Sequence, residues 1–173
     1  MADMNLLNQI LNEILVCACE VLDQGLGGEP GARCGCPCRA FVTVGSPVWD
    51  IESCCSDGQL AVYVKDIFPF SNFPSRNGEA NICSPSLAAN VSVQLLRCWP
   101  TMAEDGTAPT GPAIQQASED LYRDMYLLTW GLVCCLKTNS RRRKYILNGS
   151  RPVGPQGGCA GIEVDFTIEL LDV

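Results

Sequence analysis

The stretch GIEVDFTIEL at residues 161–170 constrains the fold of this chain more than any other segment. Apolar and polar residues alternate strictly from Ile162 onward, and a β-strand points successive side chains to opposite faces of its sheet. One face would carry Ile162, Val164, Phe166, Ile168 and Leu170, and the other Glu163, Asp165, Thr167 and Glu169. We therefore expect a strand inside a sheet, with Phe166 in the core against a helix and three carboxylates on the opposite face.

Two longer segments, 4–23 and 113–138, repeat apolar residues at the i, i+3, i+4, i+7 spacing of amphipathic helices. Residues 39–45 and 88–99 are typical of strands. Residues 54–70 resemble one arm of a hairpin, with Asp57-Gly58 as the turn signal. Glycine and proline predict loops at 69–86, 100–112 and the basic segment 137–158. The pattern predicts one α+β domain over residues 1–173, with a small mixed or antiparallel sheet, two main helices packed on one face, and long loops.

Composition argues against several classes of function. The chain has no histidine, which removes Ser-His-Asp and Cys-His catalysis and histidine-ligated zinc. Its net charge of −7 disfavours a surface that wraps nucleic acid. No apolar run reaches the ~18 residues of a membrane span, and no phosphate-binding loop motif occurs. We expect neither an enzyme nor a cofactor, and no contact with a membrane.

The twelve cysteines leave three alternatives open. Cys36, Cys38, Cys54 and Cys55 could supply four thiolates to zinc, although C-x-C and C-C spacings are not those of the usual C-x2-C zinc sites. A disulfide between the 34–38 loop and Cys54 or Cys55 is the second alternative. In the third, most of the cysteines are small buried side chains or incidental loop thiols. We expect no tightly bound metal.

Positive charge is concentrated in Arg141, Arg142, Arg143 and Lys144. Such a basic loop can be a solvated surface, touch phosphate, or meet acidic groups of a neighbouring subunit. From the residues alone these three alternatives stay open.

Three sequence segments together resemble a known group of proteins. They are CGCPCRAFVTVG, then WDIESCCSDGQLAVYVKDIFPFSNFP, and finally SRRRKYILNGSRPVGPQGGCAGIEVDFTIEL. In this order they resemble head-to-tail connector proteins of long-tailed, siphovirus-type actinobacterial phages, and the order of elements is similar to that of phage tail terminators. The likeness covers most of the chain.

The resemblance implies a structural virion protein, assembled in the host cytoplasm, at the junction of head and tail. It implies a homo-oligomeric ring, a hexamer or a dodecamer, that contacts neighbouring neck and tail proteins and lets DNA pass without sequence-specific binding. In such a ring Glu163, Asp165 and Glu169 would line the DNA channel or lie against a basic patch of a neighbouring subunit; the alternative is an ordinary solvated face. We expect this face to stay free of cations near the DNA path. We expect the cations of residues 141–144 to meet acidic groups across a subunit interface. At least one of the loops 69–86 and 100–112 would contact another subunit or ring. The alternative function is a small soluble binding module held together by a metal or disulfide cysteine cluster.

Overall fold

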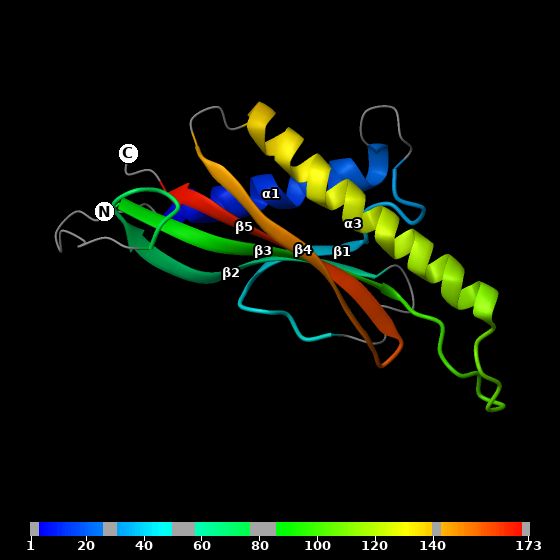
Figure 1. Cartoon of the computed structure of the whole chain (residues 1–173). Coiled ribbons are helices and arrows are strands. Elements are labelled where there is room, and N and C mark those ends of the chain that lie inside the picture. Colours follow the sequence, from blue (N-terminus) through cyan, green and yellow to red (C-terminus); the bar gives the residue numbers. More distant parts are fainter. Residues whose placement is uncertain (1–3, 26–30, 50–57, 77–85, 140–142, 171–173) are drawn as a thin grey trace.

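The computed structural model describes residues 4–25, 31–49, 58–76, 86–139 and 143–170. The elements, in chain order, are α1 (Met4–Gln24), β1 (Arg39–Val44), β2 (Gln59–Phe70), β3 (Ser86–Cys98), α3 (Gly111–Asn139), β4 (Tyr145–Gln156) and β5 (Cys159–Leu170). The strands form one sheet in the order β1-β2-β3-β5-β4. Both helices cover the same face of this sheet (Figure 1). The expected α+β fold, with a mixed sheet and two helices on one face, is confirmed.

The sheet is antiparallel except at one edge. β1 runs parallel to β2, whereas β2–β3, β3–β5 and β5–β4 are antiparallel pairs. β2 does pair antiparallel with the next strand, β3, as one arm of a hairpin would, but the predicted tight turn at 57–58 does not join β1 to β2, because parallel neighbours cannot be joined by a tight turn. Asp57 lies outside the described residues. β5 lies between β3 and β4, inside the sheet as the alternating pattern predicts.

The structure also corrects the expectation of a loop over 137–158. Tyr145–Gln156 form strand β4, which pairs with β5 along most of its length. Pro152, Pro155 and Gly149 suggested a loop, since proline cannot donate a backbone hydrogen bond to a neighbouring strand. An edge strand tolerates proline, and β4 is an edge strand with two register shifts, between Leu147 and Gly149 and between Val153 and Gln156.

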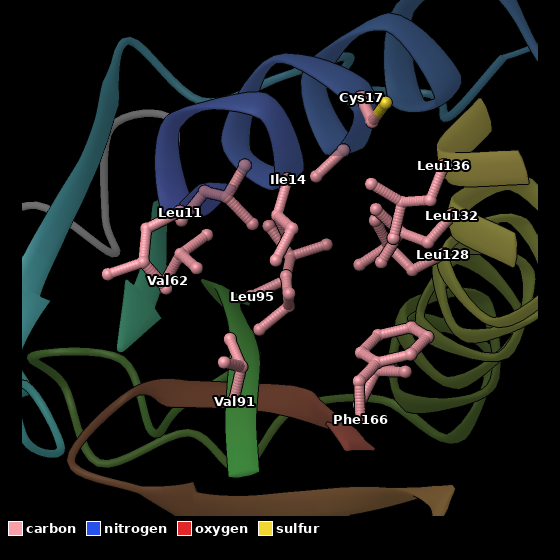
Figure 2. Packing of buried hydrophobic residues seen from close by; sticks show 14 of the residues in the cluster. Leu11, Ile14, Cys17, Val62, Val91, Leu95, Leu128, Leu132, Leu136 and Phe166 are labelled. Atoms are coloured by element: carbon pink, nitrogen blue, oxygen red, sulfur yellow. The ribbon is translucent and has the colours of Figure 1, made fainter. Parts of the chain in front are cut away.

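The apolar core lies between the helix layer and the sheet. Leu128, Leu132 and Leu136 point inward from α3, and Phe166 rises toward them from β5 (Figure 2). Phe166 is fully buried, which confirms its predicted place in the core. Burying side chains of this size contributes about 1.5–3 kcal/mol each relative to exposing them, so this layer supplies the main driving force for folding.

The two helices approach closely where α3 has a glycine. A Cβ atom added to Gly131 would lie 2.2 Å from a methyl carbon of Val21 on α1, so a larger residue would push the helices apart. A disulfide between Cys17 and Cys135, with 5.8 Å between the Cα atoms, joins the same two helices. This disulfide connects positions 118 residues apart and so ties the N-terminal helix to the second half of the chain.

Candidate functional site

The face of the sheet turned away from the helices carries a layer of polar side chains. β2 contributes Tyr63 and Lys65, β3 contributes Ser92, and β5 contributes Glu163 and Asp165. Strand register brings them together, because Ser92 pairs with both Tyr63 and Asp165 across the two antiparallel ladders. On the other side of β5, the register of β4 places Arg151 directly opposite Glu163.

Glu163 is the centre of this layer. Its side chain is 5% exposed and contacts two cations: Lys65 Nζ lies 2.7 Å from Oε1, and Arg151 Nη2 lies 2.6 Å from Oε2. Arg151 Nε donates a second bond to Oε2 at 3.0 Å. The hydroxyl of Tyr63 donates to Oε1 at 2.9 Å, and the Ser92 hydroxyl lies 2.8 Å from the same atom. A buried carboxylate needs such compensation, because removing an ion from water costs several kcal/mol.

These contacts set the ionisation of the layer. Burial raises the pKa of Glu163, but the bonds from Lys65, Arg151, Ser92 and Tyr63 outweigh it and bring the pKa down to about 2. Burial lowers the pKa of Lys65, yet its bonds to Asp165 and Glu163 leave that pKa raised overall. Glu163 and Lys65 therefore stay charged through the neutral range, which suits a permanent ion pair and not proton transfer.

The polar layer continues along β5 through one further ion pair and then through uncharged groups. Lys65 also lies 2.8 Å from Oδ1 of Asp165. Further along, the Thr167 hydroxyl donates to Oδ1 of Asn90 at 2.8 Å and accepts from the Asn148 amide at 2.9 Å. These bonds link side chains of β2, β3, β5 and β4 across this face, whereas the buried side-chain oxygens of Gln59 and Gln94 have no hydrogen-bond partner among the described residues.

The expectation of a cation-free acidic face is therefore wrong. Glu163 and Asp165 share Lys65, and Arg151 completes the neutralisation of Glu163. Glu169 lies 3.5 Å from Lys144, with only 11% of its side chain exposed. Sequence alternation placed the carboxylates on one face correctly, but the cations come from neighbouring strands and from residues just before β4. A bare carboxylate lining for DNA is absent from this face among the described residues.

The basic segment is divided between described and undescribed residues. Arg141 and Arg142 lie outside the described residues. Arg143 lies 3.1 Å from Glu13 of α1, and Lys144 contacts Glu169. The two described cations of this segment therefore meet carboxylates of their own chain, and their expected contact with another subunit remains a prediction.

The cysteine-rich loop forms neither the zinc site nor the disulfide to Cys54 or Cys55 that the sequence suggested for Cys36. Cys36 is bonded to Cys19 of α1, with 4.8 Å between the Cα atoms. It therefore supplies neither a zinc thiolate nor a bond to Cys54 or Cys55, which lie outside the described residues. Cys38 and Cys34 are exposed free thiols. In the described part of the chain, no group of three or more cysteine or acidic side chains is placed to hold a metal ion.

Two hollows lie beside charged residues. One, of about 390 Å³, lies over the polar layer. It is lined by Tyr63, Val64, Lys65, Gln94, Arg151 and Glu163, together with Gly45 and Ser46, which directly follow β1. Because its cations already neutralise carboxylates, it offers little attraction for phosphate. The other, of about 550 Å³, lies between α3 and the end of β3.

The second hollow contains a buried ion pair. Arg97 Nε lies 2.8 Å from Oδ2 of Asp124, and Arg97 Nη2 donates to the carbonyl of Gly35 at 2.6 Å. Burial raises the pKa of Asp124, although Arg97 opposes this. The pair joins β3, α3 and the cysteine-rich loop, so we assign it a structural role.

A feature missed in the sequence is an aromatic stripe on α3. Tyr122, Tyr126 and Trp130 are exposed by 61%, 53% and 58%. Their i, i+4, i+8 spacing was available in the sequence, beside the apolar stripe that packs on the sheet. The sequence did not show whether another element covers this stripe. In the described structure neither α1 nor the sheet covers it.

No protein-family model matches the chain, and no curated protein matches it. Within the described residues, neither helix has the length and apolar character needed to cross a membrane.

Proposed function

We propose that this chain is a structural component of the head-to-tail junction of a long-tailed phage, a tail terminator or neck connector. It would assemble into a ring in the host cytoplasm, contact neighbouring neck and tail proteins in the virion, and let DNA pass through its opening. The sequence resemblance over most of the chain supports this class of protein. The arrangement of two helices on one face of a small sheet is compatible with it (Figure 1).

The observation that carries the proposal in the structure is the loop of residues 100–110 between β3 and α3. It projects beyond the end of the sheet (Figure 1), and Met102 within it is 66% exposed. Its tip is nonetheless ordered by bonds from Ala103 N to the Thr107 carbonyl and from Gly106 N to the Ala103 carbonyl, both 2.9 Å. This connection is longer than the median of about 4–6 residues for loops in compact domains. An arm of this kind suits a contact with the next ring.

Net charge is compatible with a DNA conduit. Each copy carries −7, so a hexamer carries 6 × −7 = −42. DNA-binding surfaces hold phosphates with lysine and arginine, and such contacts make binding strong and salt-dependent. An acidic ring whose Lys65 and Arg151 already neutralise Glu163 would let the duplex slide without strong attachment.

The test combines location and assembly. Gold-labelled antibody against the chain should mark the junction of head and tail in particles of the phage that encodes it. Purified assemblies should have masses near 6 × 18.7 ≈ 112 kDa or 12 × 18.7 ≈ 224 kDa.

Deleting residues 103–107 together with Met102→Ser should leave the chain folded but block joining of heads to tails. The exposed Ile67→Ser serves as the control. Absence of the chain from particles, or labelling elsewhere on them, would overturn the proposal.

A second candidate is a small binding module stabilised by disulfides. The Cys17–Cys135 and Cys19–Cys36 disulfides favour it, since such cross-links stabilise small domains chiefly by restricting the unfolded chain. This function requires a chain that forms no ring of about 112 or 224 kDa (6 × 18.7 or 12 × 18.7) and is absent from virions, so the same experiments separate the two candidates.

A further inference from the structure

The outer face of α3 carries a symmetrical pattern of residues. Glu119, Tyr126, Trp130 and Lys137 follow one another at spacings of 7, 4 and 7 residues. At 3.6 residues per turn these spacings keep all four side chains along one line of the helix, over about 27 Å. All four are exposed. The line has an acidic end, an aromatic centre and a basic end.

Charges at the two ends of this line are available to a partner. Glu119 accepts a hydrogen bond from the neutral amide of Gln115 at 2.9 Å. Neither Glu119 nor Lys137 forms an ion pair with another described residue, in contrast to the carboxylates of the polar layer. Their separation of 18 positions corresponds to about five turns, so they point to the same side of the helix.

We propose that this face binds the same face of a second copy of the chain, with the two α3 helices antiparallel. A two-fold axis that crosses the exposed face of α3 at the level of residue 128 along the helix places Glu119 against Lys137 of the second copy. It also places Tyr126 against Trp130 and Tyr122 against Cys134. The contact is isologous, so each opposite-charge pair and each aromatic pair forms twice. Charge complementarity selects the antiparallel arrangement, because a parallel one would set Glu119 against Glu119 and Lys137 against Lys137.

The aromatic centre supplies the attraction and the charged ends supply the orientation. Tyrosine and tryptophan are enriched among the residues that carry most of the energy of protein interfaces. Three half-exposed aromatic side chains bury less than the ~800 Å² per partner of a standard stable interface. The dimer is therefore weak and depends on protein concentration.

This contact is independent of the proposed ring. A two-fold contact closes after two copies, whereas a ring needs two different surfaces on each subunit. The dimer is a property of the purified chain and is measured without phage particles. If the dimer is not found, the head-to-tail proposal is unaffected. If the head-to-tail proposal fails, the dimer proposal is likewise unaffected.

The test is a charge exchange followed by sedimentation velocity over a range of protein concentrations. Glu119→Lys and Lys137→Glu should each raise the dissociation constant by about tenfold or more, because each places like charges opposite one another twice. The double variant Glu119→Lys/Lys137→Glu should restore dimerisation to near the parent level. Glu104→Lys, in the exposed 100–110 loop, changes the net charge as Glu119→Lys does and should leave dimerisation unchanged.

Truncating the aromatic centre gives a second measurement. Tyr126→Ala/Trp130→Ala should abolish the dimer, while the thermal unfolding midpoint of the monomer stays near that of the parent because both side chains are exposed. A parent chain that remains monomeric at the highest attainable concentration overturns the proposal. So does a double charge variant that dimerises no better than the single variants, or an aromatic variant that dimerises like the parent.

Discussion

The two faces of strand β5 are both buried, but by different means. Phe166 and its apolar neighbours are covered by α3, and this burial is favourable without any particular partner. Glu163 on the opposite face is covered by Lys65, Arg151, Tyr63 and Ser92, and its burial is acceptable only because each of its oxygens is bonded. The comparison teaches that alternation of polar and apolar residues predicts two faces, not which of them meets water.

The faces also differ in what they contribute. Apolar packing stabilises the fold, whereas replacing a buried ion pair by apolar residues is often neutral in free energy. The polar layer instead fixes register. A slip of one residue between β4 and β5 would move Arg151 from Glu163 to the opposite face and leave a buried carboxylate without its cation.

The largest expected effect is on the apolar face. Phe166→Ala should lower the free energy of unfolding by about 3–5 kcal/mol, because it removes buried surface and leaves a cavity beneath α3. Urea denaturation at neutral pH measures this loss. Leu147→Ala is the matched control, since Leu147 pairs with Phe166 across β4–β5 but is exposed. Equal stability of the parent and Phe166→Ala would contradict the assignment of the core.

A smaller effect, with a dependence on pH, is expected on the polar face. Glu163→Gln should cost about 1–3 kcal/mol at neutral pH, because Lys65 and Arg151 lose a buried charged partner. The pKa of Glu163 is lowered from 4.5 to about 2, so its ionised form stabilises the folded state. That contribution is complete above pH 4.5 and is lost as the pH falls toward 2.

Unfolding free energies of the parent and Glu163→Gln should therefore converge as the pH is lowered through this range. Glu104→Gln, a change at an exposed loop residue, should have no effect at any pH. A difference between the parent and Glu163→Gln that is constant from neutral pH to pH 2.5 would show that the charge of Glu163 is not what the layer depends on.

The smallest effect is expected at the rim of the polar layer. Lys144 is 67% exposed and 3.5 Å from Glu169, and such pairs contribute about 0–1 kcal/mol. Lys144→Gln should reduce stability within that range, and added salt should remove the difference by screening. If Lys144→Gln lowered the free energy of unfolding as much as Glu163→Gln does, solvent exposure would not predict how much an ion pair of this layer contributes to stability.

Local patterns in the sequence determined most of the elements. The apolar periods of α1 and α3 and the alternation of β5 follow from backbone geometry, so they predicted these elements and the burial of Phe166. β4 was missed because Pro152 and Pro155 disfavour a strand in general, whereas the sheet places this segment at an edge where proline is tolerated. The parallel β1–β2 pair was missed because pairing direction is set by the connection between the strands.

The candidate site depended on contacts that the sequence does not specify. By itself the sequence determined that Glu163, Asp165 and Glu169 share a face and that Tyr122, Tyr126 and Trp130 share a stripe, because each follows from the period of one element. Only the tertiary structure brought Lys65 to Asp165, a hundred positions away, and Arg151 to Glu163 across β4–β5. It also decided that the carboxylates are covered and the aromatic rings exposed, because burial depends on which elements pack together and not on the pattern of any one of them.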